Sequence, residues 1–304
     1  MKTEKIGKVL INYDNYKGSD AYNEGDDVEE RILEVLKTGQ NITEALLQDS
    51  RWPILYQLSP RRECIIEPMD IRKSDNVLEI GAGMGAVTGA IAKRCNSVEC
   101  IELSKRRSLA NAYRNQGYDN IQIVVGNFQD ITFQHQYDVI TLIGVLEYAQ
   151  SYIRTENPYQ DFLKKIYGLL KEGGRLYIAI ENKLGLKYFA GCMEDHIGIP
   201  FAGIEGYSEK DRARTFTKSE LTALILDAGF CSTYYYYPFP DYKLPREIFS
   251  DDFLPNESFV PELQNYDMDK ISVFNERKAY QSLSGLEEIK ILSNSFLVEA
   301  IRES

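Results

Sequence analysis

The sequence predicts an α/β fold in which a mainly parallel sheet of seven strands has helices on both faces. Two observations favour this fold. From Asp75 onwards, short apolar runs suited to buried strands alternate with helical patterns, as they do in parallel sheets. The first such run, Val77 to Ile80, leads directly into a turn with glycines at positions 81, 83 and 85. A strand, a glycine-rich turn and a helix in this order can hold a nucleotide.

Apolar runs and capping residues place the individual elements. Strands are expected at residues 76–80, 97–101, 121–125, 137–143, 175–180, 231–237 and 293–301. Helices are expected at residues 85–95, 105–116, about 159–171 and 215–229. Two insertions remain, at about 182–214 after the fifth strand and at about 241–289 between the sixth and seventh. Long loops on a rigid sheet are where substrate residues usually lie.

Residues 1–70 precede the sheet and are expected to form an arm and a helical cap, whereas residues 71–304 form one domain with its insertions. Lys5 to Tyr13 has β character and residues 17–27 are polar, so the extreme N-terminus is expected to be loosely attached. The apolar residues that follow have helical spacing up to Gly39, a typical helix stop.

Composition limits the partners and the compartment. The formal net charge of -11 disfavours nucleic acid, because binding to phosphates relies on a surplus of Lys and Arg. Five cysteines are scattered without a Cys-x-x-Cys pair and are expected to be buried thiols. No signal peptide is recognisable, and no run of about 18 apolar residues occurs. These features predict a cytoplasmic protein without a membrane span.

The glycine turn and one acidic residue predict the cofactor site. Glycine at 81 and 83, with Ala82 between them, allows an adenosine to approach the backbone closely. Glu102 ends the next strand about 20 residues on, where a carboxylate accepts both ribose hydroxyls, and Leu103 follows it. The six residues from Gly81 also satisfy the dinucleotide fingerprint, so this motif alone does not choose between NAD and S-adenosylmethionine.

The order Glu-x-Gly-x-Gly-x-Gly from Glu79 to Gly85 resembles the S-adenosylmethionine-binding loop of class I methyltransferases. The resemblance extends from about Trp52 to the end of the chain. It implies a Rossmann-like fold, S-adenosylmethionine as the methyl donor, and a cofactor site that includes Glu79 and Gly85. A likeness of the same loop to rRNA adenine dimethylases ends after residue 143, where those enzymes have Asn-x-Pro-Tyr and this chain has Gly-Val-Leu-Glu.

Several stretches, Glu194-Asp195-His196 among them, resemble methyltransferases of bacterial surface-polysaccharide gene clusters. This narrower resemblance implies a small hydroxylated acceptor, such as a sugar or a sugar nucleotide, and leaves open a homodimer or a glycosyltransferase partner. Two rival functions are retained: methylation of RNA or protein by the same fold, and a non-catalytic module that binds S-adenosylmethionine.

Ligands of open α/β sheets lie beyond the carboxyl ends of the strands, which adds four candidates to the cofactor site. Asn127 could bond the adenine edge and Phe128 could stack on its face; a turn residue and a core aromatic are the alternatives. Gly144 and Glu147 resemble the segment that small-molecule methyltransferases place under the methionine end. Glu147 could equally be an acid favoured at a helix start.

The segment before the glycine turn is rich in aromatic residues. Ser59 and Pro60 are typical of a helix N-terminus, and this helix is expected to lead into the turn. Tyr56 and Arg61 could close over the methionine end of the cofactor. Packing against the first strand is the alternative.

Methyl transfer to a hydroxyl is assisted by a base, and the chain has two histidines. His135 is expected in a polar turn before the fourth strand, opposite the end at which the cofactor is expected. His196 is therefore the candidate general base, oriented by Asp195 or Glu194; a solvated loop histidine is the alternative. No residue spacing predicts a metal site. Glu194, Asp195 and His196 could ligate a divalent ion only with help from residues that the sequence does not identify.

Four residues of the insertions are candidates for gripping the acceptor, because carbohydrate sites favour aromatic and acidic side chains. They are Tyr207, Asp241, Tyr242 and Lys243.

Overall fold

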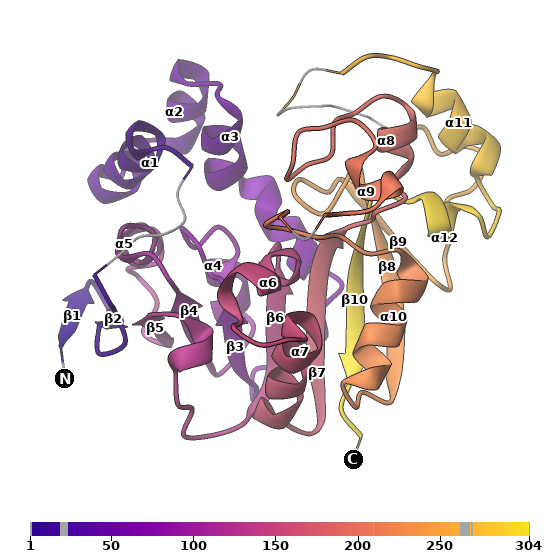
Figure 1. Cartoon of the computed structure of the whole chain (residues 1–304). Helices are drawn as coiled ribbons and strands as arrows, with labels where there is room; N and C mark the ends of the chain where they lie inside the picture. The colour runs from indigo at the N-terminus through magenta and orange to yellow at the C-terminus, as the bar shows by residue number, and fades with distance from the viewer. Residues whose placement is uncertain (1, 19–23, 209, 262–267, 269, 304) are drawn as a thin grey trace. The chain divides into compact units, whose positions relative to one another are not determined.

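The structure is a computed structural model that describes residues 2–18, 24–208, 210–261, 268 and 270–303. These residues form two compact units (Figure 1). The first comprises residues 1–142 and 169–174, and the second comprises residues 143–168 and 175–304. Ten strands occur among the described residues, three more than the sequence predicts. The domain boundary near residue 70 stays a prediction.

The N-terminal arm is not loosely attached, because it forms two strands of the first unit. β1 (Thr3–Ile6) and β2 (Val9–Asn12) pair antiparallel, and β2 then pairs in parallel with β5 (Ile121–Val125). Val9 and Ile11 are fully buried. Burial of these apolar side chains and the backbone pairing together attach the arm firmly. Part of the polar stretch that follows, residues 19–23, lies outside the described residues.

The helical cap follows the arm and packs around its own apolar core. It consists of α1 (Asp26–Thr38), α2 (Ile42–Gln48), α3 (Trp52–Leu58) and the 3-10 helix η1 (Pro60–Ile66). Gly39 ends α1 with a left-handed φ of 67°, as expected. Ile32 and Leu58 are buried in this core together with Ala110 of α5 (Lys105–Arg114).

The remaining strands of the first unit match their predicted positions closely. They are β3 (Asn76–Ile80), β4 (Ser97–Glu102) and β6 (Tyr137–Ile143), and the strand order of this unit is β1-β2-β5-β4-β3-β6. All neighbours except β1 and β2 run parallel. α4 covers only Thr88–Ala92 of the helix predicted at 85–95. It begins later than predicted because Gly85 has a left-handed φ of 74°, and residues 85–87 belong to the turn.

The second unit contains the other strands, in the order β7-β10-β8-β9, except that residues 170–174 of β7 belong to the first unit. They are β7 (Leu170–Glu181), β8 (Ser232–Phe239), β9 (Glu247–Ser250) and β10 (Ser295–Ile301). β10 runs antiparallel to both β7 and β8. β7 begins earlier than predicted: Lys171 belongs to the strand rather than to α7 (Pro158–Leu169), and its ammonium pairs with Asp138 at 2.8 Å.

Helices of the second unit lie in the insertions and between the strands. They are η3 (Leu146–Tyr148), α6 (Ala149–Tyr152), α8 (Leu186–Phe189), α9 (Ala202–Glu205), α10 (Lys218–Asp227), α11 (Glu276–Leu283) and α12 (Ile289–Leu292). Part of the second insertion, residues 262–267 and 269, lies outside the described residues.

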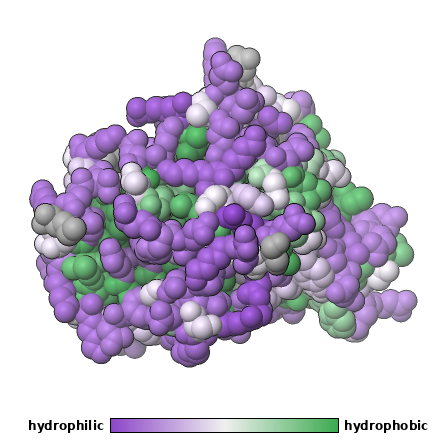
Figure 2. All heavy atoms as spheres, turned by 90° about the horizontal axis from the view of Figure 1, so that it is seen from below, coloured by the Kyte–Doolittle hydropathy of each residue, from purple (hydrophilic) through white to green (hydrophobic). Residues whose placement is uncertain are grey.

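Two surface properties complete the description. No described helix is both long and apolar enough to cross a membrane. The face drawn in Figure 2 is mostly hydrophilic, with apolar residues showing between the polar ones.

Candidate functional site

The backbone between β3 and α4 forms an open glycine turn. The N–H groups of Gly81 and Ala82 both donate to the carbonyl of Ile101, at 2.9 and 3.1 Å, which attaches the turn to β4. Gly81 and Gly83 have φ of 73° and 53°, a left-handed conformation that favours glycine. A Cβ on Gly83 would meet no other atom within 4 Å, so the space beside this backbone is open.

Glu102, the last residue of β4, lies directly against this turn. Its carboxylate accepts the N–H of Gly83 at 2.8 Å and that of Ser104 at 2.8 Å. Its side chain is buried, and burial raises its pKa. The glycine turn and a carboxylate at the neighbouring strand tip are therefore adjacent, as the sequence predicts. Leu103 follows at the same tip.

Glu79 and Gly85, also predicted at the cofactor site, make contacts that fix the turn from within the protein. The Glu79 carboxylate accepts the hydroxyl of Thr88 at 2.6 Å, and burial raises its pKa to about 7. A Cβ on Gly85 would lie 2.4 Å from the side-chain oxygen of Asn111. Glycine at 85 thus permits close packing of the turn against α5. Direct cofactor contacts of both residues stay a prediction.

Asn127 and Phe128 follow β5. Asn127 makes the contacts of a turn residue, and Phe128 makes those of a core aromatic. The Asn127 side chain accepts the N–H of Gln129 at 3.0 Å and caps the short 3-10 helix η2 (Phe128–Asp130). Phe128 is buried, with its ring centroid 5.4 Å from that of Phe133. Their role toward adenine stays a prediction.

Tyr56 packs against the neighbouring residue Arg62. The guanidinium of Arg62 lies 4.1 Å from the centroid of the Tyr56 ring, and Arg62 is buried. Trp52 stacks on the same ring at 5.5 Å. Arg61 is exposed, and its backbone N–H donates to the Ser59 hydroxyl at 3.3 Å. The roles of Tyr56 and Arg61 at the methionine end of the cofactor stay predictions.

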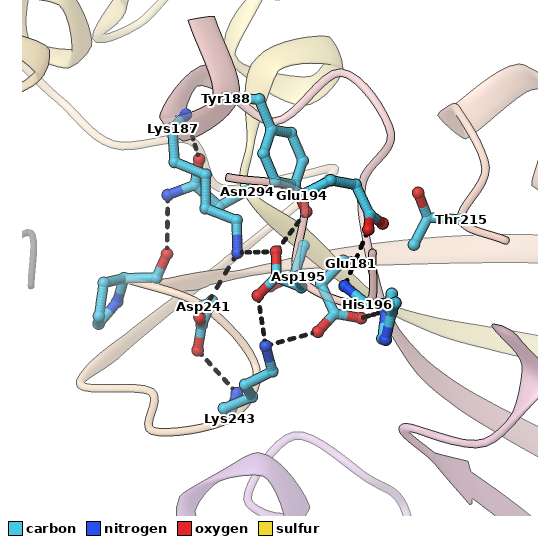
Figure 3. Close-up of polar contacts among 12 residues, drawn as sticks. Glu181, Lys187, Tyr188, Glu194, Asp195, His196, Thr215, Asp241, Lys243 and Asn294 are labelled. Carbon is cyan, nitrogen blue, oxygen red and sulfur yellow. Dashed lines mark hydrogen bonds and ion pairs between the residues drawn. The ribbon is translucent and has the colours of Figure 1, made fainter. Parts of the chain in front are cut away.

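In the second unit, five side chains from β7 and both insertions form a charged network, shown in Figure 3. The members of this charged network are Glu181, Lys187, Asp195, His196 and Lys243. The ammonium of Lys243 lies 2.7 Å from Glu181 and 2.5 Å from Asp195, and that of Lys187 lies 2.7 Å from Asp195. Burial raises the pKa of Asp195, but the two lysines outweigh burial and hold it well below its ordinary value.

The ring of His196 is hydrogen-bonded to neither of the acids predicted to orient it. Its Nε2 lies 3.4 Å from Oε2 of Glu181, and its Nδ1 lies 3.0 Å from the Tyr148 hydroxyl. Burial lowers the pKa of His196, but Glu181 and Glu147 outweigh burial and raise it to about 9. The Glu194 carboxylate accepts the backbone N–H of His196 at 2.8 Å instead of the ring. Glu181 is thus the acid that lies beside the ring, and a catalytic role of His196 stays a prediction.

Glu147, predicted near the methionine end, lies close to the charged network. Its carboxylate is buried, and one of its oxygens, Oε2, has no hydrogen-bond partner among the described residues. Burial, followed by the charge of Glu181, raises its pKa to about 8. A Cβ on Gly144, whose φ is 70°, would lie 2.8 Å from the Tyr242 hydroxyl, so glycine there permits close packing.

The four predicted acceptor residues fall into two groups. Lys243 is a member of the charged network, and Asp241 lies beside it, since Asp241 accepts the backbone N–H of Lys243 at 2.9 Å and lies 4.0 Å from the Lys187 ammonium. Tyr207 bonds Glu194 at 2.9 Å and Thr215 at 2.6 Å, and Tyr242 is almost fully buried.

Sequence reasoning missed Glu181, Lys187, Tyr148 and Tyr188, whose hydroxyl donates to Asp195 at 2.5 Å. The sequence did contain a signal for Glu181. Glu181 is an acid directly after the buried apolar run Leu176 to Ile180, so it sits at a strand tip as Glu102 does.

Comparisons with known proteins identify the family of this chain. Residues 78–178 match the family described as "Methyltransferase domain". YrhH of Bacillus subtilis, whose name assigns it to the methyltransferases, is 33% identical over 138 residues, which cover 43% of this chain and 72% of YrhH. A Pyrococcus furiosus protein named as ribosomal RNA small subunit methyltransferase A is 36% identical over 103 residues. They cover 29% of this chain and 37% of that protein, so this chain spans little more than a third of it.

A solved structure supports the fold. Phosphoethanolamine N-methyltransferase 1 of Haemonchus contortus, in complex with phosphoethanolamine and S-adenosylhomocysteine, has a TM-score of 0.50 and 12% identity. The match covers 91% of this chain and 49% of that one. This likeness supports the fold predicted from the sequence.

Proposed function

We propose that this chain, which belongs to the S-adenosylmethionine-dependent methyltransferases, transfers a methyl group to a hydroxyl of a small polar acceptor. The acceptor we propose is a sugar or a sugar nucleotide used in surface-glycan synthesis. The charged network of the second unit supports this proposal most, because both insertions contribute to it.

The cofactor is S-adenosylmethionine, and the first unit has residues that suit it. The open space beside Gly83 leaves room for a ligand against the backbone. Glu102 would accept the ribose hydroxyls, and Gly81 and Ala82 would lie under the amino-acid end. When bound, S-adenosylmethionine supplies an activated methyl group to a nucleophilic oxygen.

A hydroxylated acceptor suits the side chains of the second unit. A sugar presents several hydroxyl groups, each of which can donate one hydrogen bond and accept two. Asp241 and Lys243 offer an acceptor and a donor on neighbouring residues, and Lys187 adds a second ammonium nearby. Side chains of both signs of charge can bond such a ligand without a net charge on it.

The chain contributes to methyl transfer mainly by alignment. Holding the acceptor oxygen in line with the methyl group can account for about 7 to 11 kcal/mol of the barrier in favourable cases. The acceptor proton must also leave, and we propose that the groups around His196 assist that step, with Glu181 as the orienting acid. General-base assistance contributes roughly 10²- to 10⁴-fold.

A transfer assay tests the proposal. The full chain is incubated with S-adenosylmethionine carrying a tritiated methyl group and with sugar nucleotides, RNA or peptides in separate reactions. We expect label in the sugar nucleotides alone. Glu102→Ala should abolish it by weakening cofactor affinity, whereas Glu67→Ala, at an exposed position, should not. Label only in RNA or peptides would overturn the acceptor class, and tight cofactor binding without any label would point to the non-catalytic module.

A further inference from the structure

Three potential metal ligands from separate parts of the second unit converge in its interior. Glu147 comes from η3, Glu181 ends β7, and His196 comes from the first insertion. One ligand atom from each lies within 4.8 Å of the other two. The side chains of Glu181 and His196 are only 0% and 7% exposed. Buried carboxylates and imidazoles in such a group are usually paired or bound to a metal.

The contacts of His196 suit a metal ligand. Its Nε2 and Oε2 of Glu181 are 3.4 Å apart. Two atoms that bind one tetrahedral ion at about 2.1 Å are themselves about 3.4 Å apart. Tyr148 lies 3.0 Å from Nδ1, the ring nitrogen on the other side. Metal-binding histidines almost always use their second nitrogen in this way, which fixes the ring and its tautomer.

Glu147 provides a second, independent observation. Its side chain is 1% exposed, yet its Oε2 has no hydrogen-bond partner among the described residues. A buried carboxylate oxygen without a partner is costly. A proton shared between His196 and Glu181 would satisfy those two groups but would leave this oxygen alone. A cation bound by all three residues would satisfy it.

We propose that Glu147, Glu181 and His196 bind one divalent metal ion. Two carboxylates and one imidazole are ligands of the nitrogen and oxygen class that suits Zn²⁺, Mn²⁺ or Fe²⁺. Lys243 pairs with the other oxygen of Glu181, Oε1, and so leaves Oε2 to the ion. Three protein ligands leave at least one coordination position open.

The metal site deepens the proposed function, on which its role in catalysis rests. An acceptor hydroxyl bound at the open position would have a lowered pKa, and its proton would pass to a water molecule. Its oxygen would then form a bond to the methyl carbon while the bond between that carbon and the sulfur breaks, which leaves S-adenosylhomocysteine as the second product. His196 would then be a ligand rather than the general base, and these two roles exclude each other.

Metal binding can be measured without any acceptor. The full chain is stripped with a chelator and titrated with Co²⁺, followed by its visible absorption, and then with Zn²⁺ in competition. We expect about one equivalent of Co²⁺ per chain, without the thiolate charge-transfer band that the free cysteines would give. The isosteric Glu147→Gln should weaken binding about 100-fold, and Tyr148→Phe about 10-fold, as outer-shell partners do.

The other histidine provides a matched control. His135 lies 3.7 Å from Glu99, on the surface, so His135→Gln should bind Co²⁺ as the wild type does. Circular dichroism establishes that each variant is folded. Equal affinity of Glu147→Gln and the wild type, or no binding by the wild type, would overturn the metal site. Methyl transfer to sugar nucleotides by the metal-free chain would overturn its catalytic role while leaving the proposed function intact.

Discussion

Glu79 is a buried carboxyl whose protonation couples the stability of the first unit to pH. Burial raises its pKa from 4.5 to about 7. The folded state therefore holds the proton more tightly than the unfolded chain does. Its stabilising contribution is complete below about pH 4 and is lost as the pH rises through about 7. Since one pKa unit corresponds to about 1.4 kcal/mol, the full effect is about 3 kcal/mol.

The variant Glu79→Gln keeps an oxygen that can accept from Thr88 and removes the titration. We expect the melting temperature of the wild type to fall between about pH 5 and about pH 8 by several degrees more than that of Glu79→Gln. The exposed variant Glu67→Gln should follow the wild type. Parallel curves for the wild type and Glu79→Gln would contradict this coupling.

Single residues of the second unit were harder to predict from the sequence than the glycine turn. Glu194, Asp195 and His196 are adjacent in the chain, which suggested that they act on one another. Adjacent loop residues project in different directions, however. Glu194 bonds backbone N–H groups, Asp195 pairs with lysines, and His196 meets Glu181. The true partner lies 15 residues earlier in the sequence, at a strand tip, and only the fold brings it close.

At the scale of elements, the strand β2 makes a prediction about stability. Ile11 is fully buried where β2 pairs with β5, whereas its neighbour Leu10 is 38% exposed. Truncating a buried Ile to Ala removes packing and leaves a cavity, which costs about 2 to 5 kcal/mol. We expect Ile11→Ala to lower the free energy of unfolding in urea by that amount and Leu10→Ala by less than about 1 kcal/mol. Equal effects would mean that the arm is as loose as its sequence suggests.

The elements predicted best are those whose signals are local. β5 and β6 have their predicted bounds, and Thr217 forms the capping box that begins α10. The arm was misjudged because four-residue strands such as β1 and β2 have little pattern of their own. Their stability comes from pairing and burial with residues more than 100 positions away, such as Ile123. β9 was missed because it is equally short, although it pairs with the nearby β8.

At the scale of the whole molecule, charge separates a small acceptor from RNA. The chain has 35 basic and 46 acidic side chains, which gives a net charge of -11. Its densest basic run, Lys105-Arg106-Arg107, does not form a free patch, because Arg106 pairs with Asp26 and Arg107 pairs with Glu29, each at 2.8 Å. Few phosphates could therefore be neutralised. Binding would release few counterions, so this release would contribute little to the affinity for RNA.

We therefore expect RNA to bind this chain more weakly than about 10⁻⁴ M near physiological salt, the weak end of non-specific binding. The dissociation constant is measured by fluorescence anisotropy with labelled single-stranded and hairpin RNA, at about 50 and about 200 mM salt. The informative variant is Asp26→Asn, which removes the carboxylate 2.8 Å from Arg106, leaves Glu29 at 3.7 Å, and should bind RNA no more weakly than the wild type. Micromolar binding that falls steeply with salt would mean that a local basic surface outweighs the net charge. RNA would then replace the sugar as the acceptor to test first.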